Sequence, residues 1–174
     1  MPGSVRPVRG LPAIAALLSS LALLAAGCGD DDSAAPSGAG VYADAETARV
    51  PLASTADPAG AEGYTLTVSD VTIAAGDVLD PHFHDGTQTA HIDSGVLTYS
   101  VIEGAVPVMT GSPEDDPELV TEIKAGETAE IEPGQWVVEE RGDVHMAENE
   151  GDVPVEITLT ALLRDGAEAS TPAE

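Results

Sequence analysis

Residues 82–88 read His82-Phe83-His84-Asp85-Gly86-Thr87-Gln88, and this stretch holds two of the four histidines in the 174-residue chain. If His82 to His84 form a β-strand, successive side chains alternate between its faces, so both imidazoles point the same way. A third histidine, His145, lies far downstream. Two imidazoles on one face, with a third brought in by the fold, indicate a site for a divalent transition metal.

Glycines and polar residues surround these histidines at regular spacings. The first group reads Gly76-x5-His82-x-His84-x3-Gln88-x6-Gly95, and the second reads Gly134-x5-Glu140-x-Gly142-x2-His145-x3-Asn149. In this order the two groups resemble the two sequence motifs of the cupin superfamily, which cover the centre of the domain. The chain departs from that pattern twice, because Gln88 stands where the family usually has Glu and Glu140 stands where it has Pro.

The resemblance implies an all-β fold, a small jelly-roll β-barrel of two antiparallel sheets with a metal inside its mouth. It places the metal ligands at His82, His84, Gln88 and His145. Since a Gln oxygen carries no charge, we expect either a more weakly held ion or three imidazoles plus water. On this view Gln88→Glu tightens metal binding. The ion can be Zn, Mn, Fe, Ni or Cu, and the general affinity order favours Cu and Zn.

The residues themselves also favour an all-β domain. From Tyr64 onward, short β-favouring runs recur, each bounded by Gly, Pro, Asp or Asn, and no amphipathic helix is evident. Asp85-Gly86 predicts a tight turn that returns the chain antiparallel and brings Gln88 beside the histidine pair. We expect the domain to cover residues 63–164 and residues 165–174 to form a polar tail. His91 is expected to face outward.

The N-terminal residues 1–27 have the features of a lipoprotein signal peptide. Arg6 and Arg9 precede an apolar stretch that ends in Leu23-Leu24-Ala25-Ala26-Gly27-Cys28, which resembles a bacterial lipobox. Cys28, the chain's single cysteine, is then the site of lipidation, and residues 28–62 form a flexible, lipid-anchored tether rich in Ala, Gly, Ser, Pro and Asp. This predicts an extracytoplasmic protein anchored to the bacterial cell membrane. An ordinary secretory signal is the alternative.

Charge excludes one class of partner. The chain has 6 basic and 31 acidic residues and a formal net charge of −25. Nucleic acid is therefore not an expected partner, since phosphate binding needs clustered Lys and Arg. The membrane is expected as a partner only through the lipid anchor. A small-molecule ligand or substrate is the expected partner, and, because family members often dimerise, a second copy of the chain is another.

Three hypotheses for function follow from the resemblance. The protein is a metal-dependent dioxygenase-like enzyme, a non-catalytic module that binds a small molecule or metal at the cell surface, or a barrel in which the ion only stabilises the fold. The sequence offers no arginine cluster that would recognise a substrate and no carboxylate that can be placed as a catalytic base. It therefore leaves the choice between enzyme and binding module open.

Overall fold

The computed structural model describes residues 45–174, which form twelve β-strands. In chain order they are β1 (Ala48–Ala56), β2 (Tyr64–Ile73), β3 (Val78–Phe83), β4 (Gly86–Ser94), β5 (Leu97–Glu103), β6 (Ala105–Ser112), β7 (Asp116–Lys124), β8 (Thr128–Ile131), β9 (Trp136–Glu139), β10 (Val144–Glu148), β11 (Val155–Arg164) and β12 (Thr171–Pro172). The predicted signal peptide, Cys28 and the first part of the predicted tether lie outside the described residues. Among residues 45–174, no helix could cross a membrane.

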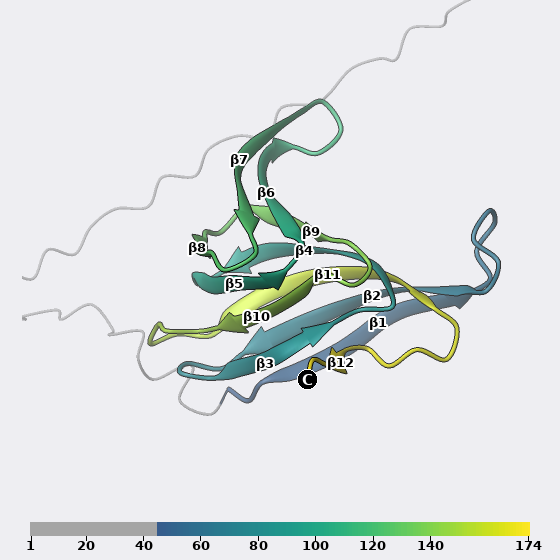
Figure 1. Ribbon diagram of the computed structural model, residues 1–174, viewed down its shortest axis with the longest axis horizontal. Helices are drawn as coiled ribbons and strands as arrows, with labels where there is room; N and C mark the ends of the chain where they lie inside the picture. Colours follow the sequence, from purple (N-terminus) through teal and green to yellow (C-terminus); the bar gives the residue numbers. More distant parts are fainter. Residues whose placement is uncertain (1–44) are drawn as a thin grey trace, which may run out of the picture. The chain divides into compact units, whose positions relative to one another are not determined.

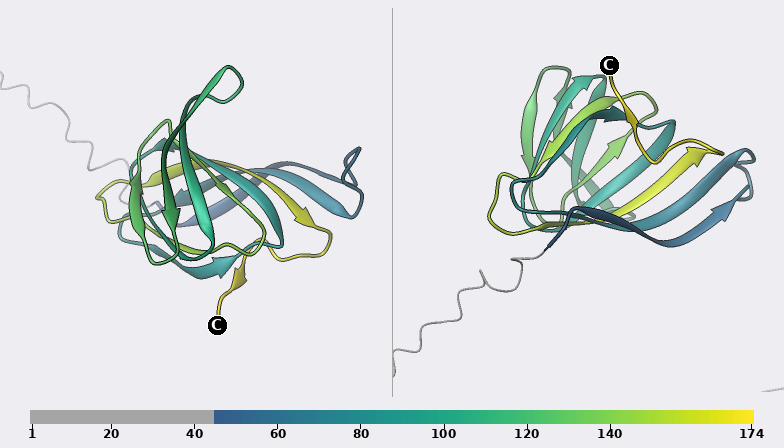
Figure 2. Two further views of the ribbon diagram at one scale, coloured as in Figure 1. Left: turned by 45° about the horizontal axis from the view of Figure 1, so that its top comes forward. Right: turned by 90° about the horizontal axis from the view of Figure 1, so that it is seen from below.

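The strands form two sheets in which every pairing is antiparallel. The first sheet has the order β1-β2-β11-β4-β9-β6-β7, and the second has the order β12-β3-β10-β5-β8. Figures 1 and 2 show both sheets, with the β6–β7 hairpin extending beyond the neighbouring strands. The prediction of an all-β fold made of two antiparallel sheets is confirmed.

A hydrophobic core fills the space between the sheets. Buried and more exposed residues alternate along β4 and β11, as expected for strands with one face turned inward. The inward face is built mainly from β-branched and other apolar side chains, among them Ile73, Ile92, Val101, Val137 and Ile157. Burial of such side chains is the main term that stabilises the fold, at about 25 cal/mol per Å² of apolar surface.

The first strand begins before residue 63, the predicted start of the domain. β1 lies inside the residues assigned to the tether, yet it pairs with β2 from Ala48 to Ala56. The sequence did not suggest a strand here, because small residues give no clear alternation of polar and apolar positions. Pro51 also argued against a strand, since it has no N–H to donate to a neighbouring strand. The strand tolerates Pro51 because it lies at the edge of the sheet, and the register shifts between Pro51 and Ala53.

The predicted polar tail is also part of the fold. Within residues 165–174, β12 pairs with β3, and the N–H of Ala173 donates to the carbonyl of Pro81 over 2.9 Å. Figure 1 shows this C-terminal segment beside β3. A two-residue strand that includes a proline carries no periodic pattern, so the sequence could not reveal it.

The predicted tight turn at Asp85-Gly86 is wrong in its geometry. β3 and β4 belong to different sheets, so the chain crosses from one sheet to the other here and does not close a hairpin. Gly86 lies opposite Leu163 of β11, and a Cβ at this position would stand 2.1 Å from the carbonyl oxygen of Leu162. Glycine is required by the close approach of β4 and β11, and not by a turn.

We therefore expect Gly86→Ala to lower the free energy of unfolding by about 1–3 kcal/mol, because the added methyl forces two strands apart. Thr89→Ala is the matched control, since Thr89 is an exposed residue of the same strand. This substitution should lower the free energy of unfolding by less than about 1 kcal/mol. Urea denaturation measures both values. Equal effects of the two substitutions would contradict the steric explanation.

Candidate metal centre

Three histidines lie together at one end of the core. His82 is in β3, His84 directly follows that strand, and His145 lies opposite His82 in the pairing of β10 with β3. The ring centroid of His82 is 5.1 Å from that of His84 and 4.4 Å from that of His145. One ring nitrogen from each histidine lies within 4.8 Å of the others, so the three could hold a metal ion. The structure thus brings together the three histidines that the sequence analysis singled out.

Backbone carbonyls fix the orientation of all three rings. The partners of Nδ1 are Asp80 O for His82 at 2.6 Å, Ala169 O for His84 at 2.7 Å and Asp143 O for His145 at 3.2 Å. A carbonyl oxygen can only accept, so Nδ1 must donate, and in the neutral ring the lone pair is then on Nε2. Donation from the distal ring nitrogen to a fixed acceptor is the usual support of a metal-binding histidine.

Burial keeps two of these rings neutral. Removal from water lowers the pKa of His84 to about 4, although the negative charge of Glu139 opposes the shift. Burial lowers the pKa of His145 as well, against the same opposing charge. Nε2 of His84 is buried and has no hydrogen-bond partner among the described residues. A buried, unprotonated nitrogen without a partner is unfavourable on its own and fits a ligand of a metal ion.

The structure adds a residue that the sequence analysis missed. Glu139, in β9, is only 4% exposed, and its carboxylate oxygens lie 3.5 Å from Nε2 of His84 and 3.5 Å from Nε2 of His145. Oε1 accepts a 2.8 Å hydrogen bond from the hydroxyl of Tyr99. The sequence offered no carboxylate that could be placed as a catalytic base, and the structure sets one beside two of the histidines.

Gln88 reaches the site as predicted, but it contacts Glu139. The two residues face each other across β4 and β9, and Nε2 of Gln88 donates to Oε2 of Glu139 over 2.5 Å. Oε1 of Gln88 is buried and without a hydrogen-bond partner among the described residues. Its role as a ligand stays a prediction, and its amide now has a second role, which is to hold a carboxylate.

Tyr99 belongs to the site, whereas Asn149 and His91, which the sequence analysis named, lie in the scaffold and at the surface. Tyr99 is buried and stacks on His145 with centroids 5.2 Å apart, and burial, reinforced by Glu139, raises its pKa well above the usual value, so its hydroxyl stays protonated. Asn149 is buried and donates to the carbonyls of Ile73 and Val153, which is a structural role. His91 is exposed beside Asp93, as predicted.

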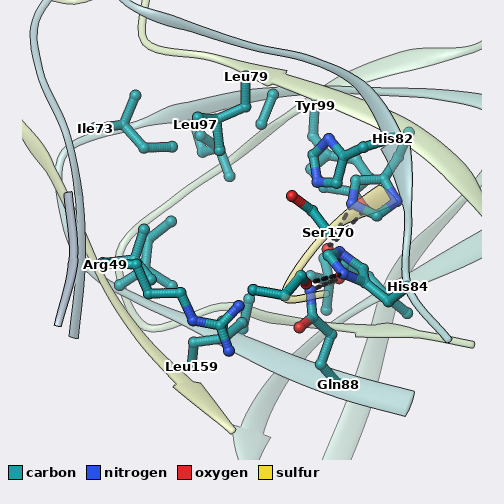
Figure 3. A pocket seen from close by; sticks show the side chains of 18 of the residues that line it. Arg49, Ile73, Leu79, His82, His84, Gln88, Leu97, Tyr99, Leu159 and Ser170 are labelled. Atoms are coloured by element: carbon teal, nitrogen blue, oxygen red, sulfur yellow. Dashed lines mark hydrogen bonds and ion pairs between the residues drawn. The ribbon is translucent and has the colours of Figure 1, made fainter. Parts of the chain in front are cut away.

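A cavity of about 350 Å³ opens beside the histidines. Figure 3 shows His82, His84 and Gln88 on one side and a group of apolar side chains on the other. Its apolar wall includes Val71, Ile73, Leu79, Leu97, Ile157 and Leu159. The C-terminal segment contributes Ala169 and Ser170 to the lining. The cavity is within the usual size range for a small-molecule site.

Comparisons with known proteins give likenesses of fold. No protein-family model and no curated protein matches the chain. Among solved structures it is similar to a cupin 2 conserved barrel domain protein from Leptotrichia buccalis, at 17% identity and a TM-score of 0.46, over 71% of this chain and 43% of that one. It is similar to the DMSP lyase DddQ from Ruegeria pomeroyi DSS-3, at 19% identity and a TM-score of 0.41, over 62% of this chain and 43% of that one.

A third similar structure is that of a conserved protein with a double-stranded beta-helix domain from Klebsiella pneumoniae, at 22% identity and a TM-score of 0.35, over 75% of this chain and 88% of that one. The chain spans less than half the length of the first two proteins. These matches are likenesses in the arrangement of the strands and do not extend to what each protein does.

Proposed function

We propose that the protein is a metal-binding protein of the cupin type, in which His82, His84 and His145 hold a divalent transition metal at the head of the cavity. The observation that carries this proposal is the convergence of three imidazoles whose Nδ1 atoms are all tied to backbone carbonyls. Such an arrangement presents three Nε2 lone pairs to one point. The ordered motifs and the two-sheet topology support the family assignment.

The reaction class that the geometry supports best is metal-dependent oxygenation of a small molecule. The cavity is mostly apolar and large enough for a ligand, and three imidazoles leave coordination positions open. When bound, a redox-active ion such as Fe, Mn or Cu would supply the activation of oxygen. Glu139 is within reach to accept a proton from a bound substrate, held in place by Gln88 and Tyr99.

A non-catalytic binding module is the second candidate, and one observation favours it. Both carboxylate oxygens of Glu139 already accept hydrogen bonds, so the group can serve as a fixed anchor of the site. Oxygen uptake separates the two functions: the purified, metal-loaded protein is screened with catechols, thiols and flavonoids. Turnover with any of them supports the enzyme, whereas binding without turnover supports the module.

Replacing both His82 and His84 with Ala should abolish stoichiometric metal, because two of three imidazole ligands are lost. Elemental analysis of the purified protein measures the metal content. His91→Ala is the matched control and should leave it unchanged, since that ring is exposed and away from the cavity. Retention of one metal ion per chain after both changes would rule out the site.

The direct pairing of Gln88 with Glu139 predicts the outcome of a charge exchange. Glu139→Gln should weaken metal binding about 10–100-fold, because it removes the carboxylate that lies 3.5 Å from both His84 and His145. Adding Gln88→Glu to that variant should restore affinity, since the negative charge returns across the strand pair. Competition with a metal chelator gives the affinities.

The single substitution Gln88→Glu should, in contrast to the expectation from sequence, give little gain. It would set two carboxylates at hydrogen-bond distance, and one of them would remain protonated. A marked gain in the single variant, together with no rescue in the double variant, would show that Glu139 does not supply the charge.

We further propose that Cys28 anchors the protein outside the cytoplasm through a lipid, on the support of the lipobox-like run before it. Cys28→Ser should move the protein from the membrane fraction to the soluble fraction, because each buried acyl methylene contributes about 0.8 kcal/mol. Ser33→Ala, a change after the predicted cleavage point, is the control. Fractionation followed by immunoblotting reads the result, and an anchored Cys28→Ser protein would exclude lipidation there.

A further inference from the structure

Arg49 enters the cavity from β1, the strand that the sequence analysis assigned to the tether. It lies opposite Val71 in the pairing of β1 with β2, and both residues line the cavity. Figure 3 shows Arg49 on the side facing His82 and His84, with its guanidinium in the space between. Arg49 also borders a neighbouring hollow lined by Leu163 and Arg164.

Arg49 differs from the other basic residues of the described chain in having no acidic partner. Lys124 is close to Glu122, and Arg141 and Arg164 both pair with Asp85. No carboxylate of residues 45–174 forms a salt bridge with Arg49, whose Nε donates to the hydroxyl of Ser69 over 3.3 Å. Its two terminal nitrogens have no hydrogen-bond partner in the described part of the chain, which leaves their N–H groups available to a ligand.

The electrostatic balance of the cavity favours an anion. Among its lining residues the charged groups besides the histidines are Arg49 and Glu139. Burial lowers the pKa of the Arg49 guanidinium, and the charge of Glu139 opposes that shift, but an arginine remains charged at any physiological pH. The charges of Arg49 and Glu139 cancel each other. A divalent metal at the histidines therefore leaves an excess of positive charge within the apolar walls.

We infer that the cavity binds a small organic carboxylate, held by the guanidinium of Arg49, with its apolar body against Ile73, Leu79 and Leu159 and its reactive end toward the histidines. A guanidinium presents two parallel N–H groups that match the two oxygens of a carboxylate. A single arginine among aliphatic side chains suits a monoanion with an apolar chain better than a phosphate. The assignment rests on the proposed function of this site, because it names the class of molecule that the metal centre receives.

A purely structural role for Arg49 makes a different prediction. Its contact with Ser69 joins the edge strand β1 to β2, and loss of that contact would affect stability alone. Ligand discrimination between a charged and an uncharged molecule of the same shape separates the two roles. Hexanoate and hexanamide are such a pair.

The experiment measures hexanoate and hexanamide affinity by NMR titration of the protein, with and without added zinc. The wild type should prefer hexanoate, and Arg49→Gln should weaken hexanoate binding about 10–100-fold, the usual range for a hydrogen-bonded charge pair. The hexanoate affinity of Arg49→Lys should fall between those of the wild type and Arg49→Gln, since lysine keeps the charge but lacks the paired N–H groups of the guanidinium. The control Arg141→Gln removes an exposed guanidinium and should bind as the wild type does.

Two results would overturn the inference: equal affinity of the wild type for hexanoate and hexanamide, or unchanged hexanoate affinity in Arg49→Gln. The first needs no variant, so it decides the matter even if a substitution impairs folding. Metal content is measured on the same samples and should not change in Arg49→Gln. Hexanoate binding that depends on Arg49 in a protein that takes up neither zinc nor manganese, iron, nickel or copper would support the inference and refute the proposed metal site.

Discussion

The pairing of β10 with both β3 and β5 is the constraint on which the site depends. It sets His145 opposite His82, so residues far apart in sequence meet at one point. The register shifts next to His145 in both pairings, between Val144 and His145 on one side and between His145 and Ala147 on the other. Irregularities of this kind redirect a side chain while the ladder continues. The histidine is thus aimed by backbone pairing, and its ring is then oriented by the carbonyl of Asp143.

The charge of the site is supplied from an unexpected strand. In the motif that the chain resembles, the acidic residue belongs to the same segment as the first two histidines, where this chain has Gln88. Here Glu139 occupies the facing position on β9, and the amide of Gln88 donates to it. The amide and the carboxylate therefore lie on two neighbouring strands, and the site has a negative charge beside His84 and His145.

Much of the fold and part of the site could be predicted from local patterns. The alternation along the strands and the spacing around His82, His84 and His145 indicated an all-β fold and the meeting of three imidazoles. Glu139 was missed because its inward position depends on which face of β9 is buried, and the adjacent Glu140 drew attention as the motif position. The signal that could have revealed it is its place two residues after Val137, at the end of a short apolar run, because the two side chains then share one face of the strand.

The ends of the domain were less predictable for a related reason. β1 and β12 are edge strands that contain Pro51 and Pro172, and an edge strand needs neither an alternating pattern nor a complete set of N–H donors. Their position is set by partners distant in the chain, which no local window reports. Arg49 could therefore not be connected with the cavity, although it was one of very few basic residues.

The two ends of the described chain both line the cavity: β1 contributes Arg49, and the C-terminal segment contributes Ser170 and Ala169, whose carbonyl orients His84. The three clustered histidines, in contrast, lie in or directly after strands between these two ends. The histidines and part of the cavity lining therefore come from different segments of the chain. The central strands can keep the histidine cluster while substitutions in the two end segments change the part of the lining that these segments supply. A change of ligand then needs no change in the two motifs.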